Sequence, residues 1–285
     1  MQRGDADFGV VPFENSTNGA VIFTLDNLAN RHATCPDISV CGEAYVDVHH
    51  FLLGHKGAAH HHAHLDDAGS GSATPTAAEP NPRRPRARPT GSLRHVQRLY
   101  SHPQAWGQCA VFLSTYLKGV ETIDVSSTSR AAEMVKEDAS GTSAAISSEI
   151  AARVYGLDVL ASCIEDREDN TTRFLVIRRT SRPDLRVPVR EPEAGGRRTK
   201  SLVSFTVPHR EPGALADVLD CFRRQRLNLT SINSRPSLLE AFQYLFFVEI
   251  EGHYDRDEGV REAFEGVKRV AQSSRWLGSW DSQRS

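Results

Sequence analysis

Residues 201–280 carry the pattern that most constrains how this chain folds. Residues 201–209 alternate in side-chain type, which is typical of a strand with one buried face. One side of that strand is Val203, Phe205 and Val207, and the other is Leu202, Ser204 and Thr206. Residues 228–237 and 241–252 predict two further strands.

Two helices complete this pattern. In residues 213–228, apolar side chains recur at the spacing of one helix face, at Leu215, Val218, Leu219 and Phe222. Residues 258–272 predict a second helix, and residues 276–280 a short closing strand. The order of elements predicts a ferredoxin-like βαββαβ unit. Such a unit is a common scaffold and indicates no function by itself.

Composition divides the rest of the chain. Residues 57–92 contain almost no large apolar side chain, so we expect a disordered surface insertion. Residues 179–200 are rich in Pro, Gly and charge, which favours an interdomain linker. We therefore predict a first domain over 1–180, a linker over 181–200 and a second domain over 201–280.

The first domain alternates strands and helices. Residues 8–16 and 122–129 are apolar runs that end in small polar residues, as strands do. Residues 102–117 carry Pro103 where a first helical turn tolerates it, and residues 143–156 predict a helix that stops at Gly156. The alternation predicts an α/β layer fold, in which ligands gather at strand ends and helix N-termini.

Charge and cysteine usage indicate which partners and which cellular compartment to expect. The chain has 36 acidic and 34 basic residues, which gives no electrostatic argument for a nucleic-acid or membrane partner. Five scattered cysteines without a C-x-x-C motif indicate a reducing, cytosolic compartment. No apolar run reaches the roughly 20 residues of a membrane span, and no apolar signal-peptide core follows Met1. We expect a soluble, unexported protein that binds a small molecule or a protein.

Polar residues follow several of the predicted strands. Glu14, Asn15 and Ser16 come after an apolar run and before Gly19, which suits either a polar turn or a strand-end pocket. Ser101 begins a helix on which Gln104 and Gln108 share one face. The N-terminus of this helix is either ordinarily capped or an anion-binding site.

Two further clusters resemble these. Ser127 and Thr128 precede a helix whose amides can hold a carboxylate, while a hydroxyl also caps the helix. In residues 169–177, Thr171, Thr172 and Arg173 stand before an apolar strand. Arg173 is either a clamp for a carboxylate or a member of a surface ion pair. The candidate partners of that ion pair are Asp166, Glu168 and Asp169.

These residue types indicate a hydrogen-bonding pocket for a small carboxylic acid, with no metal or redox cofactor. They include no Ser/His/Asp order, no Cys beside a base, no Gly-rich phosphate loop and no metal quartet. Seven of the twelve histidines fall between His49 and His64. We expect this tract to be solvated, because His60–His64 lack an acidic or Cys partner at helical spacing.

The motifs together resemble a known family. VVPFENSTNG, SHPQAWGQC, SSTSRAA, YGLDVL and NTTRFLVI, in this order, resemble the prephenate dehydratase family. GALA and NSRPS resemble its C-terminal ACT regulatory domain. The resemblance implies a two-lobed, periplasmic-binding-protein-like α/β catalytic domain followed by a ferredoxin-like ACT domain. It also implies a lyase without a cofactor, which converts prephenate to phenylpyruvate in phenylalanine biosynthesis.

The resemblance assigns roles by motif. Thr172 matches the family's catalytic threonine, which we expect to donate a hydrogen bond to the departing oxygen. Arg173 and Glu14 join it as catalytic candidates. The remaining matches imply substrate binding by Asn15, Ser16, Ser101, Gln104, Gln108, Ser127, Thr128 and Phe174.

In the second domain the resemblance implies a phenylalanine site and a homo-oligomer, dimeric or tetrameric, formed through the ACT domain. The matching residues are Gly213, Ala214, Leu215, Asn233, Ser234, Arg235 and Pro236. The family has an acidic residue where this chain has Asn233, which weakens a contact to the ammonium of phenylalanine.

The start of the chain departs from the family. Members open with a strand and helix that carry a Gly-Thr-x-Ser segment, whereas this chain begins at GDADFGVVPFENS. We expect the first lobe to lack that part, which exposes apolar surface. Two alternatives therefore stay open beside prephenate dehydratase: an inactive, binding-only fragment that senses phenylalanine, and an arogenate dehydratase.

Overall fold

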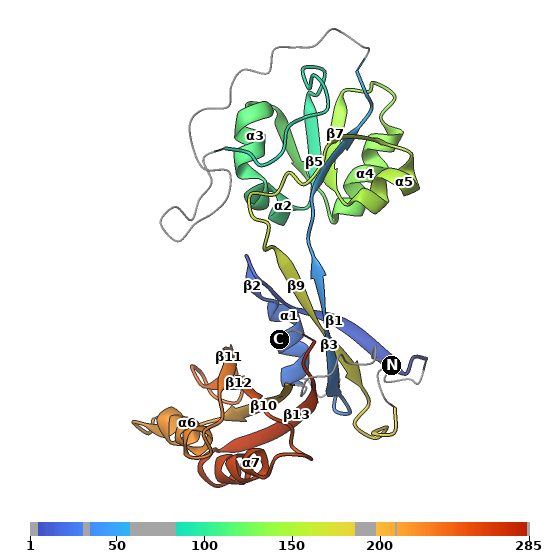
Figure 1. Cartoon of the computed structure of the whole chain (residues 1–285). Helices are drawn as coiled ribbons and strands as arrows, with labels where there is room; N and C mark the ends of the chain where they lie inside the picture. Colours follow the sequence, from blue (N-terminus) through green and yellow to red (C-terminus); the bar gives the residue numbers. More distant parts are fainter. Residues whose placement is uncertain (1–4, 31–34, 58–83, 186–197, 209, 284–285) are drawn as a thin grey trace. The chain divides into compact units, whose positions relative to one another are not determined.

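A computed structural model describes residues 5–30, 35–57, 84–185, 198–208 and 210–283. Three β-sheets and seven α-helices lie in these ranges, and the chain divides into two compact units (Figure 1). One unit comprises Asp47–Asn170, and the other combines Met1–Val46 with Thr171–Ser285. Within the described ranges, no helix is both long and apolar enough to cross a membrane.

The unit of residues 47–170 is built on a five-stranded sheet of order β6-β5-β7-β4-β8. β5 runs parallel to β6 and β7, and β4 runs antiparallel to β7 and β8. The strands are β4 (Phe51–Gly54), β5 (Arg98–Ser101), β6 (Glu121–Asp124), β7 (Ser143–Ser147) and β8 (Asp158–Ala161). The helices are α2 (Pro103–Gln108), α3 (Ala110–Tyr116), α4 (Thr128–Glu137) and α5 (Glu149–Tyr155).

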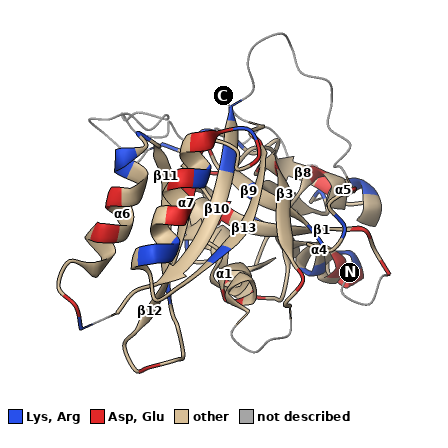
Figure 2. Ribbon diagram, turned by 90° about the horizontal axis from the view of Figure 1, so that it is seen from below, with Lys and Arg blue, Asp and Glu red and all other residues tan. Residues whose placement is uncertain are grey.

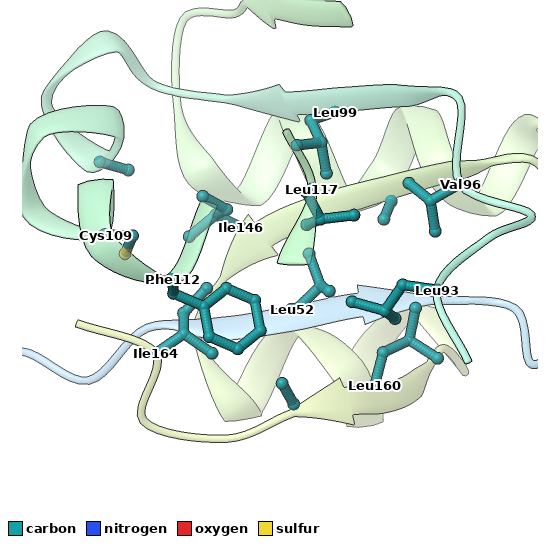
Figure 3. Packing of buried hydrophobic residues seen from close by; sticks show 13 residues of the cluster. Leu52, Leu93, Val96, Leu99, Cys109, Phe112, Leu117, Ile146, Leu160 and Ile164 are labelled. Atoms are coloured by element: carbon teal, nitrogen blue, oxygen red, sulfur yellow. The ribbon is translucent and has the colours of Figure 1, made fainter. Parts of the chain in front are cut away.

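Both faces of this sheet are covered, as an α/β layer fold requires. On one face the fully buried Phe112 of α3 lies among Leu52, Ile146 and Ile164 (Figure 3). On the other face, alanines of α4 and α5 pack with Leu53 and Ala145. The predicted alternation of strands and helices is therefore confirmed for this unit.

The helix expected over residues 143–156 is wrong in its first half. Ser143–Ser147 form β7, and only Glu149–Tyr155 are helical. Every residue of β7 is buried, so the strand shows no alternation of apolar and polar side chains. The predicted stop at Gly156 is confirmed, because Gly156 adopts the left-handed conformation at the helix C-cap.

The predicted insertion over residues 57–92 falls mostly outside the described residues, which omit 58–83. Its last part is not disordered. The Thr90 amide donates to the Leu160 carbonyl at 2.8 Å, and Arg86 pairs with Glu168. Of the predicted linker over 181–200, residues 186–197 are not described, and Thr199 and Lys200 already belong to a strand.

Residues 199–281 form the predicted βαββαβ arrangement, with sheet order β11-β12-β10-β13. Its helices α6 and α7 bear interspersed positive and negative side chains (Figure 2). The elements are β10 (Thr199–Thr206), α6 (Ala214–Arg224), β11 (Leu229–Pro236), β12 (Tyr244–Glu251), α7 (Glu258–Val270) and β13 (Ser273–Asp281). The predicted apolar face of α6 is confirmed, since Val218 and Phe222 are fully buried.

The expectation of a half-buried first strand is wrong, because Ser201–Thr206 of β10 are all buried. Val203 and Phe205 pack against α6 and α7. Leu202, on the opposite face, packs in a separate cluster with Phe13, Val40 and Leu175. A second sheet therefore covers the face that the alternating pattern assigned to solvent.

That second sheet has the order β2-β1-β9-β3, with helix α1 (Ile22–Ala29) after β2. Its strands are β1 (Phe8–Asn15), β2 (Gly19–Ala20), β3 (Ser39–Asp47) and β9 (Thr171–Arg178). Gly278 of β13 lies so close to β3 that a Cβ atom there would stand 2.0 Å from the Val40 carbonyl oxygen. Outside the shared core, Val10 and Phe23 are 62% and 82% exposed.

Candidate active site

Antiparallel pairing of β1 with β9 brings two of the predicted polar clusters together. Glu14 lies opposite Arg173, and Asn15 lies opposite Thr172. The register shifts between Pro12 and Glu14, so that Phe13 is the extra residue of a bulge. Proline cannot donate a ladder hydrogen bond, which makes this a suitable place for the irregularity.

The side chain of Asn15 has one defined orientation. Its Oδ1 accepts hydrogen bonds from the amides of Thr17 and Asn18, both at 3.0 Å. Its Nδ2 donates to Thr172 Oγ1 at 3.0 Å. Because a hydroxyl both accepts and donates, the Thr172 oxygen that accepts from Asn15 keeps its own proton for another acceptor. Asn15 therefore presents Thr172 as a hydrogen-bond donor.

Ser16 anchors the end of β9. Its hydroxyl accepts from the Thr171 amide at 2.9 Å, and its own amide donates to the Thr171 carbonyl at 2.9 Å. Asn15 and Ser16 are thus hydrogen-bonded to the neighbouring residues Thr172 and Thr171, so two of the predicted polar clusters lie side by side.

Arg173 points to the opposite face of the sheet from Thr172, since side chains alternate along a strand. Its side chain is 8% exposed, and the guanidinium forms ion pairs with two buried carboxylates, Glu249 of β12 and, at 2.6 Å, Glu43 of β3. Glu14 stands farther away, at 4.0 Å. Of the expected surface partners, Glu168 pairs with Arg86 and Asp169 with Arg167, so the predicted surface ion pair of Arg173 is wrong.

Lys200 completes this buried charge network. Its Nζ lies 3.4 Å from a carboxylate oxygen of both Glu43 and Glu249, and Thr230 donates to Glu249 at 2.6 Å. Burial alone raises the pKa of Glu43, but Arg173, the Gln283 amide and Lys200 together lower that pKa below its usual range. Both glutamates are therefore compensated by cations from neighbouring strands.

The candidates in the other unit lie at the ends of β5 and β6. Ser101 is fully buried at the end of β5, where its hydroxyl donates to the Ile146 carbonyl at 2.9 Å. His102 caps α2 through its Nδ1, which accepts from the Gln104 amide. Ser127 caps α4 by accepting from the Arg130 amide at 3.1 Å, which confirms the predicted capping role. Thr128 is the first residue of α4.

Gln108 ends α2 and contacts a residue that no sequence motif singled out. His50 Nε2 lies 2.6 Å from Gln108 Oε1, and the His50 side chain is buried. In the sequence His50 merges into a histidine-rich tract, so only the fold distinguishes it from its neighbours. Nearby, burial raises the pKa of Asp166 to about 6, although main-chain amides, that of Val111 among them, oppose the shift.

One group of three metal-ligand side chains occurs among the described residues. His49, Cys163 and Glu165 each offer an atom, and these atoms lie within 4.8 Å of one another. Glu165 already accepts from His49 at 3.1 Å, and Arg86 stands 3.7 Å from the same oxygen. The carboxylate is thus compensated within the chain. His60–His64 lie outside the described residues.

The βαββαβ arrangement of residues 199–281 carries a cavity of about 570 Å³ at the start of α6. It is lined by Val207, Pro208, Glu211, Gly213, Ala214, Leu215, Ala216, Leu219, Phe242, Tyr244 and Phe246. The other four candidates, Asn233–Pro236, lie on β11, where Arg235 pairs with Asp26 at 2.7 Å. The GALA turn therefore borders a cavity, and the NSRP segment does not line it in the described residues.

Comparisons with known proteins point to one family. A family model described as prephenate dehydratase matches residues 1–182. The chain is 34% identical over 280 residues to a bifunctional chorismate mutase/prephenate dehydratase of Neisseria gonorrhoeae, covering 98% of this chain and 63% of that protein. It is 30% identical over 280 residues to a prephenate dehydratase of Mycobacterium bovis, covering 98% and 72%.

A solved structure is also similar. The prephenate dehydratase of Arthrobacter aurescens in complex with L-Phe superposes with a TM-score of 0.72 at 30% identity, and the match covers 99% of this chain and 77% of that one. Four bifunctional relatives are longer, and the chain spans 61–63% of their length.

We predict that Arg173→Ala lowers the free energy of unfolding by about 3–5 kcal/mol, because it leaves two buried carboxylates with too little compensation. The loss is largest near neutral pH. It shrinks as the pH falls, because without Arg173 the pKa of Glu43 rises and protonation removes the uncompensated charge. Urea unfolding at two pH values measures both effects.

Arg153→Ala is the matched control, because the side chains of Arg153 and Glu149 pair on the surface of α5 and are 77% and 52% exposed. We expect a loss below about 1 kcal/mol for that pair. An equal loss in the two variants would contradict the assignment of Arg173 to a buried structural charge.

Proposed function

The chain belongs to the prephenate dehydratase family, and from that premise we propose that it converts prephenate to phenylpyruvate with loss of water and CO2. The observation that carries this proposal is the hydrogen bond from Asn15 to Thr172. It leaves the threonine hydroxyl as a donor on the face of the sheet opposite the structural Arg173.

Thr172 acts on the leaving group in this proposal. Prephenate loses its ring hydroxyl while its ring carboxylate departs as CO2, and the electron pair of the breaking C–C bond forms the aromatic ring. The departing oxygen gathers negative charge, which a positioned O–H donor stabilises. The pKa of a threonine hydroxyl is too high for Thr172 to act as a simple acid, so it acts within a hydrogen-bond network that includes Asn15. Glu14, another catalytic candidate, lies opposite Arg173 and shares its face of the sheet, so Glu14 acts on Thr172 only indirectly.

The remaining candidates bind and orient the substrate. We assign to this role Asn15, Ser16, Ser101, Gln104, Gln108, Ser127, Thr128 and Phe174. Most offer hydroxyl, amide or helix N-terminal donors, which suit a substrate with two carboxylates. The Ser101 hydroxyl already donates to the Ile146 carbonyl. We therefore assign Ser101 an indirect role, in which it orients the start of α2. Arg173 supports the strand that carries Thr172.

We also propose that the second domain is an ACT domain that binds phenylalanine as a feedback effector in a homo-oligomer. The cavity beside Gly213, Ala214 and Leu215 supports this. A second copy of the chain is the proposed source of Asn233–Pro236, since they do not line that cavity. Apolar side chains near β11 support the same contact, because Phe242, Leu239 and Ile232 are 86%, 70% and 51% exposed.

A cytoplasmic location belongs to the same proposal. All five cysteines are free, as expected of a protein that works in a reducing compartment.

We predict that the purified chain forms phenylpyruvate from prephenate and that Thr172→Ala lowers kcat at least about 100-fold. Thr172→Ser keeps a hydroxyl and retains most of the rate. Thr115→Ala is the control, because this threonine is exposed and its hydroxyl donates to the Val111 carbonyl of its own helix. Absorbance of phenylpyruvate gives the rates.

Three outcomes count against parts of this proposal. Full activity of Thr172→Ala removes the assigned role of the hydroxyl. A higher kcat/KM on arogenate identifies an arogenate dehydratase. Phenylalanine binding without turnover of either substrate identifies a binding-only chain.

We predict that Ala216→Leu weakens phenylalanine binding at least tenfold, because Ala216 is exposed and lines the cavity. Asn233→Asp strengthens binding, because a carboxylate pairs better with the ammonium of the amino acid. Isothermal calorimetry measures both affinities, and Ala139→Leu, on an exposed turn of the other unit, is the control. Equal affinities in all four proteins would place the effector elsewhere.

A further inference from the structure

We propose that His50 is a positioning residue for Gln108, holding its amide so that the NH2 group faces the substrate anion. The inference rests on the proposed function and deepens it, because the resemblance to the family assigns Gln108 and leaves His50 without a role. His50 touches Gln108 rather than the reacting atoms, so it is not a catalytic residue.

The contact itself fixes which atoms meet. His50 Nε2 lies 2.6 Å from Gln108 Oε1, and an amide oxygen can only accept. The imidazole therefore carries its proton on Nε2 and donates it to Gln108. Within the described residues, no other hydrogen-bond partner of the Gln108 side chain is found. Both N–H bonds of its amide are available to a ligand.

The backbones on both sides of this contact are tied to one segment. The Ile164 amide donates to the His50 carbonyl at 2.9 Å, and the Asp166 amide donates to the Gln108 carbonyl at 2.7 Å. Between them, Glu165 is 1% exposed and its Oε2 accepts from the His50 amide at 2.9 Å. Residues 164–166 therefore hold His50 and Gln108 at a constant separation.

The chemistry of the proposed substrate explains why this matters. Prephenate offers two carboxylates and a hydroxyl oxygen, all of which accept hydrogen bonds. An amide that rotates by half a turn presents its own oxygen to an anion, which repels it. The hydrogen bond that His50 donates to Oε1 removes that second orientation before the substrate arrives. The Gln108 side chain then loses less conformational freedom when the substrate binds.

His49 provides an internal comparison. It is adjacent to His50 and also contacts Glu165, through Nδ1 at 3.1 Å, but its side chain is 49% exposed. No contact between His49 and Gln108 is found in the described residues. A substitution at His49 therefore perturbs the same carboxylate without releasing the Gln108 amide.

The first measurement tests the contact without reference to turnover. In protein labelled with 15N-glutamine, the two amide protons of Gln108 are identified by their loss in Gln108→Ala. We expect a high order parameter of the Gln108 NH2 group, from 15N relaxation, in the unaltered chain and in His49→Ala. In His50→Ala we expect a low order parameter, because the amide group then rotates freely. An unchanged Gln108 signal in His50→Ala overturns the proposal.

The second measurement tests the consequence for turnover of prephenate. We expect His50→Ala and Gln108→Ala each to lower kcat/KM about 10- to 100-fold, and the double variant to be no worse than Gln108→Ala. His50→Gln restores a donor near Oε1 and most of the activity. His49→Ala combined with Gln108→Ala shows the product of the two separate effects.

The outcomes separate the two levels of inference. Multiplicative losses in His50→Ala/Gln108→Ala, with a normal fold, overturn the positioning role, because a purely structural loss does not depend on Gln108. No turnover by the unaltered chain overturns the proposed function and the catalytic purpose of the contact together. The order parameter of the Gln108 amide still decides whether His50 holds it.

Discussion

Arg173 forms ion pairs with Glu43 and Glu249. These ion pairs link β9, the strand of the candidate catalytic Thr172, to the sheet β11-β12-β10-β13. The three side chains come from β9, β3 and β12, and each is less than one-tenth exposed. Removing ions from water is costly, so such a group persists only where its partners are fixed. Around it, Phe13, Leu202 and Trp280 pack in the core that the two sheets share.

This arrangement separates two neighbouring residues by role. Because side chains alternate along β9, Arg173 faces the shared core while Thr172 faces the other side, beside Asn15. The bulge at Phe13 sets the register that pairs Asn15 with Thr172. A change in the second domain that moves Glu249 therefore acts on the strand that carries the threonine hydroxyl. This is a physical route by which an effector bound there would influence turnover.

The sequence predicted the βαββαβ unit well, because its helices and strands have strong periodicity. It failed at β7, where every side chain is buried, and at β10, where a second sheet covers the expected solvent face. Motif order implied that Asn15, Ser16 and Thr172 belong together. The partners of Arg173 and Gln108 could not be predicted, since Glu249 and His50 lie 76 and 58 residues away and belong to no recognised motif.

The central claim is that Arg173 supports the site without binding substrate. It is tested most directly by the prephenate turnover of a variant in which the whole network is neutral: Arg173→Met, Lys200→Met, Glu43→Gln and Glu249→Gln. No buried charge is then left uncompensated, so the variant folds. The account predicts a kcat/KM within about tenfold of the unaltered chain. A folded variant whose kcat/KM falls about 1000-fold would contradict it, because that loss is expected of a residue that binds a substrate carboxylate.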